Sequence, residues 1–173
     1  MTSLAQDVAA VVTPLANQDI VFHINPDLSI TYWSSQTSDE TQCEQYTASN
    51  LKVNGNPIYV NKELPVLAAV AYSGSGCNQD EVRVYYVAQN KFVLRELRRT
   101  GGSDAKWTDG QVFNNQQNGI AKESGLTANV VQTQGGRQQQ LKLFYQREAG
   151  QLNVTYNVIG TNDVWTNRAD VTN

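Results

Sequence analysis

The chain has 173 residues, of which 17% are charged, and its formal net charge at pH 7 is -3. This length suffices for one domain with a sizeable core. The weakly acidic balance argues against a nucleic-acid partner, which requires a basic surface, and no apolar run is long enough to span a bilayer. Gln, Asn, Thr and Ser are frequent, as expected of short strands joined by polar turns.

One pattern occurs three times along the chain. Short segments that begin at Val8, Leu67 and Leu126 lie about 59 residues apart. Each is followed by two β-rich segments, and the three pairs are Ile20–Ile24 with Ser29–Ser34, Val82–Tyr86 with Phe92–Arg98, and Leu141–Tyr145 with Leu152–Val158. Such a repeat, with several strands per unit, is typical of a β-propeller or solenoid. We therefore predict a single all-β domain with repeats at about 3–61, 62–119 and 120–173.

Within each repeat the strands should expose alternate residues on opposite faces. In the second repeat, Val82, Val84 and Tyr86 would face one way, and Arg83 and Tyr85 the other. The same alternation separates the apolar positions of 141–145 from Lys142 and Phe144. The first repeat also contains a polar stretch, 37–47, without a counterpart in the other two, and we predict a long loop there. A helix is possible only near 4–12, where the match to the second repeat favours a strand.

Two cysteines, Cys43 and Cys77, lie in polar surroundings. They would form a disulfide in an oxidising compartment or remain free thiols in a reducing one. Residues 1–15 lack the basic segment and the uninterrupted apolar run of a signal peptide. This favours free thiols and a cytoplasmic location or unconventional secretion. With only one histidine, His23 in an alternating strand pattern, the chain does not predict a metal site.

The sequence contains none of the motifs that mark common catalytic sites. There is no nucleophile elbow, no HExxH motif and no phosphate-binding glycine loop before a helix. The carboxylate pairs Asp39-Glu40 and Asp80-Glu81 lie in polar segments, where solvated acids are the simplest interpretation. We therefore predict a protein that is not an enzyme and needs no cofactor.

The second repeat resembles a known family. It contains Leu67-Ala-Ala-Val-Ala-Tyr72, Val82-Arg-Val-Tyr-Tyr86, Leu94-Arg-Glu-Leu97 and Trp107-Thr-Asp-Gly110, in that order. These motifs resemble one blade of the fungal fucose-specific lectins, the six-bladed β-propeller lectins of the orange-peel mushroom type. The resemblance covers 67–112 closely and the other two repeats more weakly. It implies four-stranded blades with sugar bound in the clefts between neighbouring blades.

The resemblance also implies which residues would bind the sugar. Arg83 and Glu96 would hydrogen-bond its hydroxyl groups, since a guanidinium donates and a carboxylate accepts. Trp165, from the following repeat, would cover its apolar face, and Gln111 would lie nearby. The alternative interpretation of Arg83 and Glu96 is a cross-strand ion pair on a sheet face.

The other two repeats depart from the family pattern. In the third, Lys142 stands at the arginine position, and Thr155 or Tyr156 at the glutamate position. In the first, these positions hold Val21 and Tyr32, and Leu51 lies near the place of the closing tryptophan. Lysine does not replace the two-pronged donor geometry of arginine. The second repeat departs too, because Arg98 or Arg99 stands where the family has a second tryptophan.

Three blades do not close a six-bladed ring, and open edges leave strands exposed. We therefore expect a homodimer of three plus three blades; a trimer or a mixed assembly is the alternative. The predicted function is lectin-like binding of fucosylated or related glycans in the cleft that holds Arg83, Glu96 and Trp165. The alternative is a propeller scaffold whose degenerate sugar sites now serve protein–protein interaction or a structural role.

Overall fold

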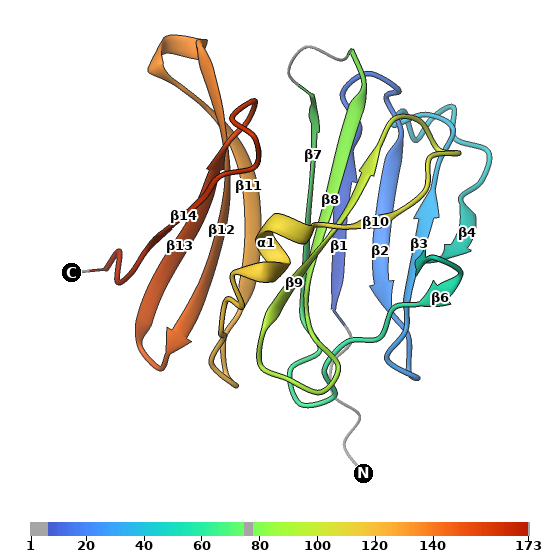
Figure 1. The fold of residues 1–173 in the computed structure, drawn as a ribbon. Helices are drawn as coiled ribbons and strands as arrows, with labels where there is room; N and C mark the ends of the chain where they lie inside the picture. Colours follow the sequence, from blue (N-terminus) through green and yellow to red (C-terminus); the bar gives the residue numbers. More distant parts are fainter. Residues whose placement is uncertain (1–6, 75–77, 173) are drawn as a thin grey trace.

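The structure is a computed structural model that describes residues 7–74 and 78–172. It contains three four-stranded antiparallel sheets, each formed by strands that are consecutive in sequence (Figure 1). The first sheet contains β1 (Val8–Val12), β2 (Asp19–Ile24), β3 (Ile30–Ser34) and β4 (Thr47–Asn50). The second contains β7 (Leu67–Ser73), β8 (Asp80–Val87), β9 (Leu94–Thr100) and β10 (Thr108–Asp109). The third contains β11 (Leu126–Thr133), β12 (Gln138–Glu148), β13 (Gln151–Val158) and β14 (Trp165–Arg168).

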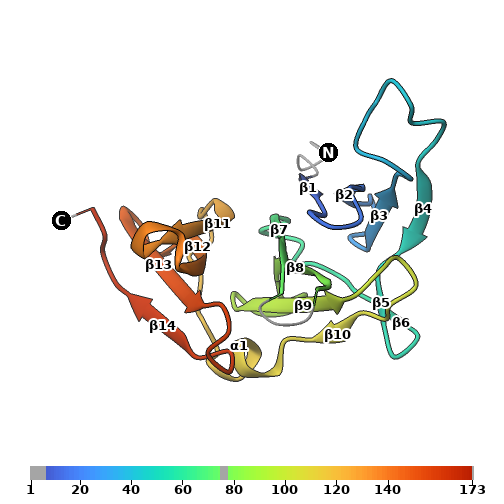
Figure 2. The same ribbon diagram turned by 90° about the horizontal axis from the view of Figure 1, so that it is seen from above.

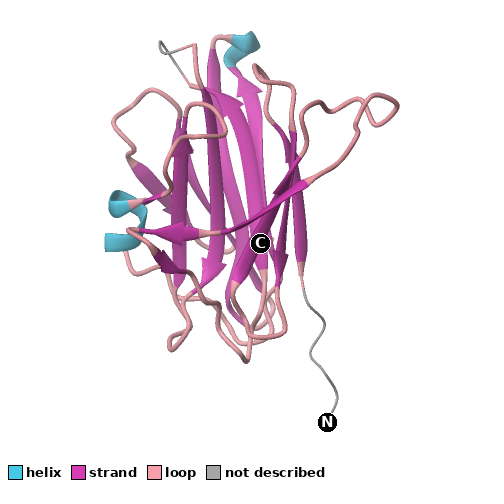
Figure 3. Ribbon diagram, turned by 90° about the vertical axis from the view of Figure 1, so that its right-hand side faces the viewer, coloured by secondary structure: helices cyan, strands magenta, loops and turns pink. Residues whose placement is uncertain are grey.

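Outside these sheets the described chain is mainly loops and turns, with few other regular elements (Figure 3). A small hairpin of β5 (Lys52–Val53) and β6 (Asn56–Pro57) follows the first sheet. One helical turn, α1 (Gln111–Asn115), follows the second, and a 3-10 turn, η1 (Gln134–Gly136), joins β11 to β12. None of the helices in these ranges has the length and apolar character needed to cross a membrane.

The three sheets are arranged as the blades of a propeller. Viewed from above, they fan out along an arc, with β1, β7 and β11 on its concave side (Figure 2). β7 contacts both β1 and β11, so each sheet packs on its sequence neighbour. We call the sheets blade one, blade two and blade three in chain order. The predicted all-β propeller fold with three four-stranded units is confirmed, whereas the predicted repeat boundaries stay predictions.

Two apolar layers fill the junctions between the blades. The layer between blades one and two includes Ile20, Phe22, Val82 and Val84. The layer between blades two and three contains the opposite face of β8 and the inner face of blade three; its members include Tyr85, Val87, Leu141, Leu143 and Tyr145. The predicted alternation of β8 is therefore confirmed. Since both faces of blade two are covered, all eight residues of β8 are buried.

The remaining local predictions are also met where the structure describes them. The polar stretch 37–47 forms a loop that reaches β4 only at its last residue, and residues 8–12 form a strand rather than a helix. The turn between β12 and β13 uses Gly150 at φ 80, a backbone conformation that glycine adopts without strain. Cys43 is a half-buried free thiol, and Cys77 lies outside the described residues.

Candidate functional site

The structure brings three of the four predicted sugar-binding residues together at the junction of blades two and three. Arg83 lies on β8, Glu96 on the neighbouring strand β9, and Trp165 at the start of β14 in blade three. The guanidinium carbon of Arg83 lies 6.0 Å from the centre of the Trp165 ring. Gln111 lies apart from this group, exposed at the start of α1.

Arg83 and Glu96 form a buried ion pair. Nη1 of Arg83 donates to Oε2 of Glu96 over 3.1 Å, and their side chains are 3% and 1% exposed. The cross-strand ion pair predicted as the alternative therefore exists. Burial alone would lower the pKa of Arg83, but Glu96, together with Tyr85, Tyr72 and Asp163, outweighs it and leaves the pKa above its ordinary value. Burial raises the pKa of Glu96, an effect that Arg83 and Tyr85 partly offset.

Glu96 is held from several sides. The hydroxyl of Tyr85 donates to Oε2 of Glu96 over 2.7 Å. Asn114 in α1 fixes the backbone, because its amide accepts from the Glu96 nitrogen at 2.7 Å and donates to the Glu96 carbonyl at 3.1 Å. Gly110, just before α1, packs directly on the carboxylate. The carboxylate is therefore fixed in position before any ligand arrives.

Trp165 packs among aromatic rings at this junction. Its ring meets Phe113 at a centroid distance of 4.9 Å and Tyr85 at 6.1 Å, both edge to face. Trp165 Nε1 and Arg83 Nε are buried and have no hydrogen-bond partner within the described part of the chain. Buried donors without acceptors are rare in native proteins. These two N–H groups could therefore donate to oxygen atoms of a ligand or of water.

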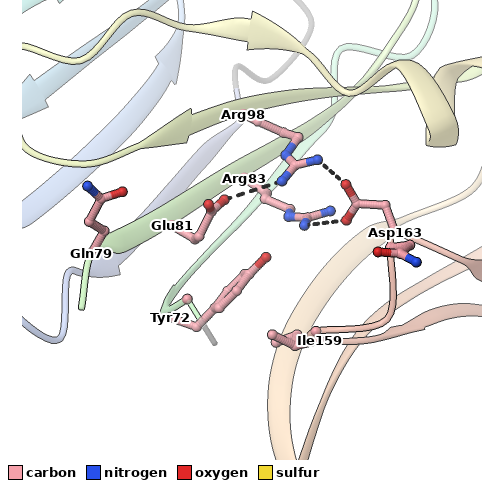
Figure 4. A pocket seen from close by; sticks show the side chains of 10 residues that line it. Tyr72, Gln79, Glu81, Arg83, Arg98, Ile159 and Asp163 are labelled. Carbon is pink, nitrogen blue, oxygen red and sulfur yellow. Dashed lines mark hydrogen bonds and ion pairs between the residues drawn. The ribbon is translucent and has the colours of Figure 1, made fainter. Parts of the chain in front are cut away.

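A third acidic residue, which the sequence did not indicate, completes the group. Asp163, in the turn between β13 and β14, accepts from Arg83 Nη2 over 2.8 Å and also from Arg98 (Figure 4). Burial would raise the pKa of Asp163, but Arg83 and then Arg98 outweigh it and hold the pKa below the ordinary value. Asp163 is therefore ionised at neutral pH.

A cavity of about 250 Å³ opens beside these charges at the junction (Figure 4). Blade two contributes Tyr72, Gly74, Gln79, Glu81, Arg83 and Arg98 to its lining, and blade three contributes Ile159, Gly160, Asn162 and Asp163. Arg83 is thus the predicted residue that borders the cavity, whereas Glu96 and Trp165 lie behind it. The charged lining suits a small polar ligand that can accept and donate hydrogen bonds.

Sequence reasoning missed Asp163, Tyr72 and the part played by Arg98. Strand alternation could have placed Arg98 on the same face as Glu96, because Glu96 precedes it by two residues. No local signal marks Asp163, because its partner Arg83 lies 80 residues away.

The strand register supports two of the equivalences predicted for the other blades. Arg83 pairs with Val70 in β7, and Lys142 pairs with Asn129 at the matching place in β11. In blade two Glu96 pairs with Tyr85, and at the matching place in blade one Tyr32 pairs with Phe22. Lys142 and Tyr32 therefore occupy the positions of Arg83 and Glu96.

The other two equivalences are corrected by one or two residues. Ile20, not Val21, pairs with Val11 and so occupies the position of Arg83 in blade one. A shift of one residue moves a side chain to the opposite face of a sheet, and Val21 accordingly faces away from blade two. In blade three Val154, which pairs with Phe144, occupies the position of Glu96, and Tyr156 occupies that of Arg98.

These corrections leave blade two as the one described blade with both an arginine and a glutamate at the two positions. Ile20 and Tyr32 cannot form an ion pair. Lys142 pairs directly with Tyr156 and lies diagonally from Val154, and neither residue is acidic. Within the described ranges, no group of three or more His, Cys, Asp or Glu side chains is placed to hold a metal ion.

Comparison with known proteins identifies the fold. No protein-family model and no curated protein sequence matches the chain. The structure of Aleuria aurantia lectin in complex with Fucα1-6GlcNAc is similar over 95% of this chain, with 21% identity and a TM-score of 0.67. AofleA from Arthrobotrys oligospora is similar over 95% of this chain, with 21% identity and a TM-score of 0.64.

The matched regions are 48% of the Aleuria lectin chain and 41% of the AofleA chain. This chain therefore spans about half of the length of these lectins or less. A further structure of the Aleuria lectin, described as a six-bladed β-propeller, is 18% identical with a TM-score of 0.63. The resemblance predicted from the second repeat is thus confirmed at the level of the fold: the chain is built as part of a β-propeller of the kind found in fungal fucose-binding lectins.

Proposed function

We propose that this protein is a non-catalytic carbohydrate-binding protein that recognises fucose-type glycans at the junction of blades two and three. The observation that carries the proposal is the meeting of Arg83, Glu96 and Trp165 beside an open cavity. Arginine and glutamate offer fixed donors and acceptors for sugar hydroxyls, and an aromatic ring covers C–H groups. Aleuria lectin structures bound to Fucα1-6GlcNAc and to α-methyl-L-fucoside share the fold.

The unsatisfied donors support the same proposal. Nε of Arg83 and Nε1 of Trp165 are buried without acceptors, which costs about 1–3 kcal/mol each, and Arg83 borders the cavity from which a ligand would supply an oxygen atom. Recognition would be non-covalent and would need no cofactor. Gln111 is exposed at the start of α1 and does not line the cavity. Its contact with the sugar therefore stays a prediction.

The proposal is tested by titrating the protein with L-fucose and following the NMR spectrum. We expect the Arg83→Ala variant to bind at least about tenfold more weakly, which corresponds to a loss of about 1.4 kcal/mol. Because Arg83→Ala leaves the Glu96 carboxylate buried without its partner, the Arg83→Lys variant is measured as well. Lysine keeps the charge but loses the planar fork of donors.

The control is Arg137→Ala, which removes an exposed arginine in the turn between β11 and β12. It should bind L-fucose as the unchanged protein does. Unaltered affinity in a folded Arg83→Lys variant would contradict the assigned site, and an unchanged protein that binds no fucosylated glycan would contradict the proposed ligand.

A second candidate function is a propeller scaffold with degenerate sugar sites that serves protein–protein interaction or a structural role. The observation that favours it is the occupation of both Arg83 Nη groups by Glu96 and Asp163. In addition, Ile20 stands at the arginine position of blade one, and Val154 stands at the glutamate position of blade three. Both residues agree with a degenerate site. A correctly folded protein without sugar affinity in the titration would support this candidate.

We further propose that two copies of the chain assemble into a closed ring of six blades. Both ends of the arc present sheet faces without a neighbouring blade. On blade one, Val8, Val12 and Trp33 are 55%, 49% and 42% exposed, and such apolar exposure marks interaction surfaces. A closed ring would cover them.

The outer face of blade three offers a second surface for this contact. It is hollowed over about 350 Å³, with Lys142, Phe144, Val154, Tyr156 and Arg168 in the lining. A two-fold axis would place this face on blade one of the second copy and repeat the contact on the other side, which closes the assembly. Since the chain spans about half of the Aleuria lectin, two copies together would match its length.

A further inference from the structure

Asp163 reaches into the proposed sugar site from the neighbouring blade. It lies in the turn 159–164 between β13 and β14, where Gly160, Asn162 and Asp163 all have positive φ, of 93°, 52° and 56°. Non-glycine residues rarely adopt this conformation, although Asn and Asp tolerate it best. The turn therefore has an unusual shape, and its carboxylate projects toward blade two (Figure 4).

The carboxylate of Asp163 occupies the accessible side of Arg83. Arg83 directs Nη1 to the deeply buried Glu96 and Nη2 to Asp163. Asp163 is 22% exposed and borders the cavity, whereas Glu96 is 1% exposed and does not. A sugar hydroxyl that enters from the cavity therefore meets Arg83 at the position that Asp163 holds.

Release of Asp163 would leave both arginines with a counter-charge. Arg83 would keep Glu96 at 3.1 Å, and Arg98 would keep Glu81, whose carboxylate lies 3.7 Å from Arg98 Nη2. Glu81 is itself oriented by the hydroxyl of Thr100 at 2.6 Å. An unpaired buried charge is what makes the breaking of an ion pair costly, and here neither arginine becomes unpaired.

We propose that Asp163 is an internal competitor of the sugar, which closes the site until its carboxylate leaves Arg83. This inference rests on the proposed function and deepens it: Asp163 sets the affinity of the site. Because only the open form binds, the apparent affinity equals the intrinsic affinity multiplied by the open fraction. Removal of the carboxylate should therefore strengthen sugar binding, the opposite of what the loss of a direct sugar contact would do.

The test uses the Asp163→Gly and Asp163→Asn variants of the full chain. Glycine accepts the positive φ of this position without strain, and asparagine keeps the shape of the side chain without its charge. Asp104→Asn is the control, because it removes one negative charge from an exposed loop residue. Two quantities are measured for each protein: the L-fucose dissociation constant and the rate at which phenylglyoxal, an arginine-specific reagent, modifies Arg83.

Modification is followed by peptide mass spectrometry, with exposed Arg137 as the internal reference. We expect Arg83 to be modified about tenfold faster in Asp163→Gly than in the unchanged protein, with L-fucose bound correspondingly more tightly. The Asp104→Asn variant should change neither quantity. Asp163→Asn should give values between those of Asp163→Gly and the unchanged protein, since its amide oxygen still accepts from one arginine.

Each result decides the question. An unchanged modification rate of Arg83 in folded Asp163→Gly overturns the competitor role, whether or not the protein binds sugar. Faster modification without fucose binding in any variant keeps the closing role of Asp163 and overturns the proposed ligand. Equal or weaker fucose binding by Asp163→Gly than by the unchanged protein overturns the inference, because Asp163 would then assist recognition.

Discussion

At the scale of single residues, Gly110 fixes how the Glu96 carboxylate lies. A Cβ atom at Gly110 would stand 2.1 Å from Oε1 of Glu96 and 2.7 Å from its Cγ and Cδ. The backbone at Gly110 has φ -77, so the position needs glycine for space and not for conformation. Glu96 cannot move aside without losing its bonds to Arg83 and Tyr85.

We predict that Gly110→Ala destabilises the protein by about 1–3 kcal/mol, the usual effect of overpacking a filled site. It should also weaken L-fucose binding, because the displaced carboxylate no longer orients Arg83. Thermal unfolding and the NMR titration measure the two effects. Gly102→Ala is the matched control, since a Cβ there meets no atom within 4 Å; equal melting temperatures for both variants would contradict the prediction.

The site was predictable from the sequence only in part, and residue spacing explains the difference. Arg83 and Glu96 lie on adjacent strands of one hairpin, so local alternation and the family motifs place them together. Asp163 comes from a turn in another blade, and its approach to Arg83 depends on how two blades pack. Contacts of this kind leave no periodic signal in the sequence.

At the scale of elements, β9 shows how one strand serves both junctions. Arg98 and Arg99 are neighbours in sequence but point to opposite faces. Arg98 shares its face with Arg83 and pairs with Asp163 and Glu81. Arg99 faces blade one, where its guanidinium carbon lies 5.3 Å from the centre of the Trp107 ring.

Arg99 is buried in an unfavourable way. It is 1% exposed, its Nε and Nη1 have no hydrogen-bond partner, and no carboxylate lies within 4.0 Å of it among the described residues. Burial lowers its pKa, although Tyr32 and Asp80 act in the opposite direction. Arg99 is therefore a buried charge whose solvation is only partly replaced.

We predict opposite results for methionine at two buried arginines. Arg83→Met should lower the free energy of unfolding by about 3–5 kcal/mol, because Glu96 loses its buried partner. Arg99→Met should leave it unchanged or raise it by about 1 kcal/mol, because an apolar side chain removes the cost of burying a charge. Urea unfolding of both variants measures the difference. A loss in Arg99→Met as large as that in Arg83→Met would show that Arg99 holds the first junction together.

The strands themselves were largely predictable, whereas their register was not. Alternating apolar residues predicted the hairpins of all three blades within a few residues of their observed bounds. The equivalence of Val21 and Tyr156 to the blade-two pair was wrong because motif spacing across a turn leaves the count uncertain by one or two residues. Only the cross-strand pairing assigns each side chain to a face, and pairing depends on turn lengths.

At the scale of the whole molecule, the two outer faces of the arc decide the assembly. Trp33 on β3 pairs with Val21 and Ala48 on the outer face of blade one. It lies in no junction within one chain and is 42% exposed. The ring proposed above would cover it with blade three of the second copy.

We predict that the protein has a mass of about twice 19.1 kDa in solution and that Trp33→Glu is a folded monomer. A carboxylate placed in an apolar interface must be desolvated without a partner, and this penalty opposes association. Light scattering measures the mass and circular dichroism checks the fold. The control is Val112→Glu, which places the same charge at an exposed apolar residue of α1.

A monomer at micromolar concentration for the unchanged protein would contradict ring closure by a second copy. A dimer that persists in Trp33→Glu would place the interface elsewhere on the molecule.

The three tryptophans of the chain occupy three different boundaries. Trp107 lies in the apolar layer between blades one and two, Trp165 in that between blades two and three, and Trp33 on the outer face of blade one. The fluorescence of each single tryptophan would therefore report a different boundary. Proteins that keep one tryptophan and carry phenylalanine at the other two positions would record, in a single unfolding series, the order in which the blades separate.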